Sequence, residues 1–173
     1  IMVEKNSSKK IDIEKISLDD EKVYTMFSEA HTTGVFQFES DGMREYLKQL
    51  KPNCIGDLIA MNALYRPGPM ANIPEFIARK NGKSKIDYIH PNLEPVLKET
   101  YGIIVYQEQV MQISQIIGSF TLAQGDMLRR AMGKKKADVM AAFKIDFVEG
   151  AVKQNYDKKL AVEIFDLLEK FAQ

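Results

Sequence analysis

The 173-residue sequence contains a single cysteine, Cys54, and two histidines, His31 and His90, which lie far apart. One cysteine excludes an internal disulfide framework and fits a reducing cytosol. Between Asn53 and Ile55, Cys54 is expected to be a small buried hydrophobe rather than a catalytic thiol. Because the cysteine and histidines are few and widely spaced, they form no zinc-binding pattern, and no metal ligand is predicted.

Long apolar runs, a signal peptide, internal repeats, glycine-rich phosphate loops and nucleophile motifs are also absent from the sequence. The longest apolar runs, of which residues 103–106 are typical, are far too short to cross a membrane. With 45% hydrophobic and 28% charged residues and a formal net charge of zero, the chain can bury a core. These features predict a soluble, ordered, cytoplasmic protein with no membrane partner.

The positive charge of this neutral chain is concentrated in one short segment. Residues 129–136 place two arginines and three lysines in eight positions. Arginine offers a rigid donor fork that matches phosphate oxygens, and lysine adds a mobile point charge. The segment therefore suggests a polyanionic ligand, either a triphosphate or a nucleic-acid backbone. The first candidates are Arg129 and Arg130, and the secondary ones are Lys134, Lys135 and Lys136.

A helical projection of this segment separates its charged from its apolar side chains. Asp126, Arg129, Arg130 and Gly133 fall on one face. The opposite face is expected to dock on a core and comprises Ala123, Met127, Leu128, Ala131 and Met132. An alternative stays open, in which Asp126 only pairs with the two arginines on a solvated surface helix, as is usual for charge runs.

Arg66 precedes a second notable pattern, Pro67-Gly68-Pro69. Two prolines around a glycine predict a rigid turn, and Pro67 restricts Arg66 to extended geometry. A fixed backbone lowers the entropy lost when the side chain grips an anion, so Arg66 is a candidate ligand contact. The alternative is that Arg66 caps the carboxyl end of the preceding helix.

Hydrophobic periodicity and chain breakers predict a mostly helical fold. Residues 1–16 are polar and Lys-rich, which indicates a linker. Two segments are candidates for short strands, namely residues 34–38 and 101–106. Gln109, on a buried stripe, is expected to brace a loop or to contact a ligand. Helices are expected from Asp19 or Asp20, from Ser40 to about Leu50, over residues 55–65, 73–81 and 107–118, from a capping box at 121–124, over a segment ending near Gly150, and from about Asp157.

Five sequence blocks occur in an order that is specific when they are taken together. They are residues 32–40 (TTGVFQFES), 64–69 (LYRPGP), 101–111 (YGIIVYQEQVM), 129–135 (RRAMGKK) and 165–172 (FDLLEKFA). Over about residues 16–173 the chain resembles the bacterial replicative DNA polymerase III alpha subunits, which are C-family DNA polymerases. The resembling segment is their fingers region.

The resemblance implies a mostly α fold with at most one or two short strands. It implies a single helical fingers domain over residues 17–173, truncated at its C-terminal end. Residues 1–16 would link this domain to the preceding palm domain.

The resemblance also implies that the parent protein is a DNA-directed DNA polymerase, a nucleotidyltransferase. The fingers would bind the triphosphate of the incoming deoxynucleotide (dNTP) through Arg129 and Arg130. Arg66 and the three lysines would contact dNTP or primer-template DNA. Implied partners are the palm domain of the same chain and other replisome subunits, including the sliding clamp.

Mg²⁺ would be held by the acidic motif of the palm domain, and no segment of this chain matches that motif. No catalytic residue is therefore expected here, and the fragment alone is expected to be inactive. Two other functions remain open, a non-catalytic helical nucleic-acid-binding module and a structural module between polymerase domains.

Overall fold

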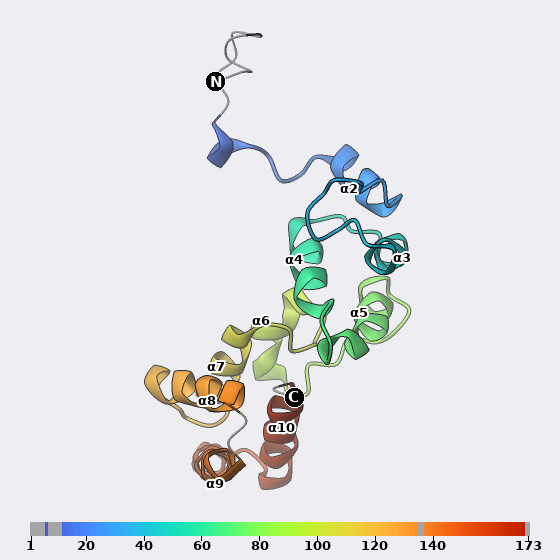
Figure 1. Cartoon of the computed structure of the whole chain (residues 1–173). Coiled ribbons are helices and arrows are strands. Elements are labelled where there is room, and N and C mark those ends of the chain that lie inside the picture. The colour runs from blue at the N-terminus through green and yellow to red at the C-terminus, as the bar shows by residue number, and fades with distance from the viewer. Residues whose placement is uncertain (1–5, 7–11, 135–136, 172–173) are drawn as a thin grey trace. The chain divides into compact units, whose positions relative to one another are not determined.

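The computed structural model describes residue 6, residues 12–134 and residues 137–171. This part of the chain consists of α-helices and 3-10 helices joined by turns, and it contains no strand (Figure 1). The predicted mostly α fold is confirmed. The chain divides into two compact units, residues 1–58 and residues 59–173. The division into a linker and a fingers domain after residue 16 stays a prediction.

The first unit is built from η1 (Ile13–Lys15), α2 (Glu21–Ser28), α3 (Asp41–Leu50) and the start of α4 (Ile55–Leu64). The carboxylate of Asp20 accepts a hydrogen bond from the Lys22 N–H at 2.9 Å, and the Ser40 hydroxyl accepts one from the Met43 N–H at 3.4 Å. These caps begin α2 and α3 at the predicted residues. The two helices pack together, and they bury Tyr24, Phe27, Met43, Leu47 and Leu50.

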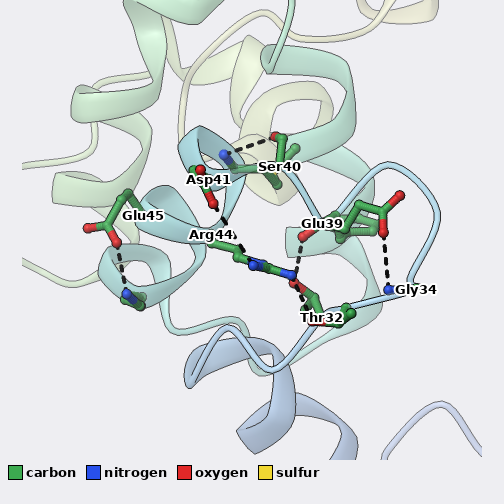
Figure 2. A network of polar contacts seen from close by, with 11 residues as sticks. Thr32, Gly34, Glu39, Ser40, Asp41, Arg44 and Glu45 are labelled. Atoms are coloured by element: carbon green, nitrogen blue, oxygen red, sulfur yellow. Dashed lines mark hydrogen bonds and ion pairs between the residues drawn. The ribbon is translucent and has the colours of Figure 1, made fainter.

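The strand predicted over residues 34–38 is wrong, because the segment folds into consecutive turns. The Val35 N–H donates to the Thr32 carbonyl at 3.0 Å, and the Phe38 N–H donates to the Val35 carbonyl at 3.0 Å. Gly34 and Gln37 have φ values of 79° and 67°, which are incompatible with an extended strand. Figure 2 shows part of the polar network that holds this turn. Alternation of apolar residues was too short a signal here to exclude a turn.

Cys54 is exposed, and the prediction that it is buried is wrong. It lies in the short bend before α4, where Pro52, Asp57 and Leu58 take the buried positions. The Asp57 carboxylate accepts a hydrogen bond from the Asn53 N–H at 3.0 Å, which closes the bend. The thiol side chain is left outside the core as a result.

The second unit continues α4 and holds most of the helices. α7 lies against α8, and α9 lies against α10 (Figure 1). Their shared core contains Phe147 and Phe165, whose ring centroids are 5.4 Å apart. The elements are η2 (Pro69–Asn72), α5 (Ile73–Lys80), η3 (Pro91–Leu93), α6 (Glu94–Leu97), η4 (Lys98–Thr100), α7 (Gln107–Ile116), α8 (Leu122–Lys134), α9 (Ala137–Lys153) and α10 (Lys158–Phe171).

The second predicted strand, over residues 101–106, is also wrong. Tyr101 and Gly102 have φ values of 53° and 79°, so the chain turns sharply at this point. The Gly102 N–H donates to the Leu97 carbonyl at 2.9 Å and closes the turn after η4. The β-branched residues that follow made this segment resemble a strand in sequence, but they form the irregular stretch that leads into α7.

Gln109 braces that irregular stretch, as the sequence led us to expect. Its Oε1 atom accepts hydrogen bonds from the Val105 and Tyr106 N–H groups at 2.8 and 2.9 Å. Its Nε2 atom donates to the Val96 carbonyl at 3.1 Å and to the Thr100 hydroxyl at 2.8 Å. One buried carboxamide therefore fixes the segment after α6 to the start of α7.

Gly150 does not end its helix, because α9 continues to Lys153. The prediction that this helix ends near Gly150 is wrong. The glycine serves packing instead, since a Cβ atom at this position would lie 1.9 Å from the Gly118 carbonyl oxygen. The backbone of α9 therefore lies directly against the turn after α7, a contact that a side chain would prevent.

Candidate functional site

α8 carries the predicted arginine pair, and its start is fixed by a capping box. The Gln124 N–H donates to the Thr121 hydroxyl at 3.3 Å, and the Thr121 N–H donates to Gln124 Oε1 at 2.8 Å. The predicted capping box is confirmed. It sets the residue at which the helix begins and therefore the direction in which each later side chain points.

The buried side of α8 differs in part from the predicted one. Leu128, Ala131 and Met132 are buried as expected, whereas the predictions for Ala123, which is exposed, and for Met127, which is 52% exposed, are wrong. The helix is rotated so that Gly125 faces α7, and a Cβ atom there would lie 3.3 Å from the Ser114 hydroxyl oxygen. Because α7 and α8 pack closely at Gly125, the buried face of α8 does not include Met127. The side of α8 that carries Arg129 lies closer to α7 as a result.

Asp126 holds both arginines. Its Oδ1 atom accepts hydrogen bonds from Arg129 Nε at 3.0 Å and Nη2 at 2.7 Å, and its Oδ2 atom lies 2.8 Å from Arg130 Nη2. The pairing expected for a solvated helix is therefore present. The two arginines are not equivalent, because the side chain of Arg129 is 32% exposed and that of Arg130 is 67% exposed.

Arg129 has a second partner, Gln107, the first residue of α7. Arg129 Nη1 donates to Gln107 Oε1 at 3.1 Å. A guanidinium has five N–H groups, so three engaged donors leave two for a ligand. Two donors are enough for bidentate contact with a phosphate. Asp126 and Gln107 thus hold Arg129 in place without using all of its hydrogen-bonding capacity.

Arg66 and Arg129 line the same cavity, which has a volume of about 220 Å³. Gln107 and Gly133 also line it, beside an apolar wall that includes Val105, Val110 and Phe171. Arg66 reaches it from the turn after α4, and Arg129 from α8. The structure therefore brings together two candidate residues that are far apart in sequence.

The turn that carries Arg66 is fixed by its backbone. Gly68 has a φ of 95°, and the Met70 N–H donates to the Arg66 carbonyl at 3.1 Å. The Arg66 guanidinium has no hydrogen bond or ion pair within residues 12–134 and 137–171. In that part of the chain it does not cap α4 with its side chain, and its donors remain available.

The other candidate residues, Arg130 and the three lysines, either do not line the cavity or are not fully described. Arg130 projects from α8 beside Asp126 and does not line the cavity. Lys134 is the last residue of α8, and its side chain lies outside the described part of the structure. Lys135 and Lys136 also lie outside the described residues.

A larger cavity of about 490 Å³ is lined by Glu75, Arg79, Ile104 and Lys170, among others. Its arginine is already engaged, because Arg79 Nε donates to Glu75 at 2.7 Å and Nη1 donates to the Tyr101 carbonyl at 3.1 Å. The hydrogen bond from Arg79 holds the pKa of Glu75 below its ordinary value. Arg79 thus ties α5 to the turn at Tyr101, and the smaller cavity remains the better candidate for an anion.

Asp126 provides a test of this geometry. The hydrogen bond from Arg129 lowers the pKa of Asp126 from its ordinary 3.8, burial opposes this shift, and the charge of Arg130 adds to it. Since the folded-state pKa is depressed, the pairing stabilises the fold above the unfolded pKa. That contribution is lost as pH falls through the folded pKa.

We expect the Asp126 carboxyl to titrate below pH 3.8 in a carbon-detected NMR experiment. In Arg129→Gln the pKa of Asp126 should rise towards its ordinary value, because the largest cause of the shift is gone. Lys48→Gln is the control, since Lys48 pairs with Glu45 instead. An Asp126 midpoint unchanged by Arg129→Gln contradicts the observed pairing.

Neither a metal cluster nor a membrane span occurs in the part of the chain that the structure describes. No three His, Cys, Asp or Glu side chains gather there in a way that could hold a metal ion. Both oxygens of Asp126, the carboxylate next to the arginine pair, are engaged by guanidiniums. The residues at this site do not fit Mg²⁺. Within the same residues, no helix is long and apolar enough to cross a membrane.

Gln107 was not predicted from the sequence to be a site residue. Asp126 was predicted only as a partner of the two arginines on the protein surface. The i+3 and i+4 spacing was a sufficient signal for Asp126. Gln107 gave no such signal, because its contact with Arg129 depends on the packing of α7 against α8.

Comparisons with known proteins show the family to which this chain belongs. Residues 1–155 match the family model of the bacterial DNA polymerase III alpha subunit finger domain. The DNA polymerase III subunit alpha of Borreliella burgdorferi is 56% identical over 160 residues, which cover 92% of this chain and 14% of that protein. That of Staphylococcus aureus (strain Mu50) is 49% identical over 172 residues, which cover 99% of this chain and 16% of that protein. The chain thus spans about one sixth or less of these relatives, and it belongs to the bacterial DNA polymerase III alpha subunit finger domain family.

Proposed function

We propose that this chain is the part of a replicative DNA polymerase that grips the triphosphate of the incoming dNTP and contacts primer-template DNA during template-directed synthesis. The observation that carries the proposal is that Arg66 and Arg129 line one cavity in a finger domain of this family. Among the residues that the structure describes, both guanidiniums keep N–H groups without a partner, which could bind phosphate oxygens. The polymerase, a nucleotidyltransferase, would act in the cytoplasm with the other subunits of the replisome, including the sliding clamp.

The chain's own residues would act by positioning and by charge. Arg129, held by Asp126 and Gln107, would bind phosphate oxygens in a fixed direction. As negative charge moves to the departing pyrophosphate, preorganised donors stabilise it without reorientation. Arg130 and the lysines Lys134, Lys135 and Lys136 would add positive charge for the triphosphate or the DNA backbone. Mg²⁺, which supplies metal-assisted phosphoryl transfer, would be held by the palm domain, outside these 173 residues.

The shared cavity can be tested with a double-mutant cycle in the full-length polymerase. We expect Arg66→Ala and Arg129→Ala each to weaken dNTP affinity in single-turnover incorporation. If both arginines bind one triphosphate, the double variant should lose less than the sum of the two single losses. Two independent effects on dNTP affinity would contradict the proposal.

The matched control is a second double-mutant cycle, in which Lys48→Ala takes the place of Arg66→Ala and is combined with Arg129→Ala. Lys48 is an exposed residue of α3 that pairs with Glu45 and lines neither cavity. Its replacement should leave dNTP affinity unchanged, alone or in combination. A loss of affinity with Lys48→Ala equal to that with Arg66→Ala would show that general charge, rather than the cavity, sets the effect.

A further inference from the structure

Phe36 is the most exposed large apolar side chain in the described part of the chain, with 82% of its surface accessible. Single exposed apolar residues are common on proteins and indicate nothing by themselves. Phe36 differs because of the turn that carries it, residues 32–39, hereafter the Phe36 turn.

Side-chain hydrogen bonds brace the Phe36 turn along its length. The Thr32 hydroxyl, which is buried, donates to the Phe38 carbonyl at 2.6 Å. The Gly34 N–H donates to the Glu39 carboxylate at 3.1 Å, and Arg44 Nη2 donates to the Thr33 hydroxyl at 2.9 Å (Figure 2). Arg44 belongs to α3, so the turn is fixed to a helix and not only to itself.

An aromatic anchor and a strained backbone complete the turn. Phe38 is buried against Phe27 with a ring-centroid distance of 5.2 Å in an edge-to-face arrangement. Gln37, between Phe38 and Phe36, has a φ of 67°, which non-glycine residues adopt only at a cost. Phe38 is thus buried and Gln37 is strained in the same turn that leaves the Phe36 side chain exposed. A side chain displayed on a fixed backbone loses little entropy when it docks.

The charges near the Phe36 turn indicate what kind of partner it fits. Residues 29–48 contain four carboxylates, one arginine and one lysine, Lys48, which pairs with Glu45. The arginine, Arg44, is directed at Thr33 and Asp41. Aromatic residues that stack on nucleic-acid bases lie in positively charged grooves that follow the phosphates. A surface with this acidic balance repels phosphates, so the chemistry favours an apolar protein pocket whose rim is cationic.

From these observations we propose that the Phe36 turn is an intramolecular docking element. Phe36 inserts into an apolar pocket with a cationic rim in a part of the same polymerase polypeptide that lies outside these 173 residues. The relatives are long enough to provide such a pocket, since this chain spans only 14–16% of their length. The inference does not depend on the role of the arginines in dNTP binding.

Photo-crosslinking in the full-length polymerase tests the occupant directly. Phe36 is replaced by p-benzoylphenylalanine, which keeps an aromatic side chain. The purified protein is irradiated with and without primer-template DNA, and the crosslinked peptides are identified by mass spectrometry. We expect one dominant crosslink within the same polypeptide, to an apolar segment outside the 173 residues and independent of DNA. The same photo-reactive residue at Lys48, exposed on α3, is the control and should give no dominant product.

The other outcomes overturn the proposal. A crosslink to DNA would indicate a base-stacking residue, and one to a second copy would indicate an interface between molecules. A crosslink to residues 59–173, or no dominant crosslink, would show that no such pocket exists. Thr33→Val removes the acceptor of Arg44 at an exposed position and should at least halve the yield of the dominant product. An unchanged yield would show that bracing by Arg44 is unnecessary and would overturn the preorganised form of the proposal.

Discussion

Replacing Arg129 with Ala in the full-length polymerase is expected to lower kcat/KM for nucleotide incorporation at least tenfold. A hydrogen bond to a charged group contributes about 1.5–3 kcal/mol, and about 1.4 kcal/mol corresponds to a factor of ten. Single-turnover incorporation at limiting dNTP measures the effect. Arg129→Lys should rescue poorly, because lysine restores the charge but cannot contact Asp126, Gln107 and a phosphate with one planar group.

Arg130→Ala is the matched comparison on the same helix. No pattern in the sequence ranks the two arginines, but Arg130 is more exposed and does not line the cavity. We therefore expect a smaller loss of kcat/KM than for Arg129→Ala. The melting temperature should barely change in either variant, since exposed ion pairs add about 0–1 kcal/mol to stability. Incorporation by Arg129→Lys at the unmodified rate would defeat the assignment of Arg129 to bidentate binding.

Replacing Gln109 with Leu should destabilise the isolated chain by roughly 2–6 kcal/mol. Leucine has a similar volume but leaves the Val105 and Tyr106 N–H groups without their acceptor, and each buried unsatisfied group costs about 1–3 kcal/mol. Urea unfolding followed by circular dichroism measures the change in the free energy of unfolding.

Gln107→Leu is the control for that experiment, because Gln107 is an exposed glutamine two residues earlier in the same helix. It should change stability by less than about 1 kcal/mol. If Gln109→Leu and Gln107→Leu unfold at the same urea concentration, the four hydrogen bonds of Gln109 do not stabilise the fold as proposed.

The elements that could be predicted from sequence are those with local causes. Asp20 and Ser40 cap their helices through bonds to residues two or three positions later. Thr121 and Gln124 do the same for α8. Such signals depend on neighbours within one helical turn, so they can be read without the fold.

The features that could not be predicted depend on contacts between distant segments or on unusual backbone angles. Tyr101 adopts a positive φ although its β-branched successors favour a strand. Met127 is exposed because Gly125 lets α7 approach from another side. Arg66 and Arg129 line one cavity only when α4, the turn after it and α8 are folded. No spacing in the sequence predicts this.

The core of the second unit has a consequence for synthesis. Leu93 and Leu97, from η3 and α6, belong to the same buried cluster as Phe165 and Leu168 of α10. A ribosome adds roughly 5–20 residues per second, so the earlier leucines leave the exit tunnel seconds before their partners exist. During that interval the part of this apolar core that α10 covers stays exposed. We therefore expect slow codons ahead of α10 to lengthen the time during which the incomplete second unit can aggregate.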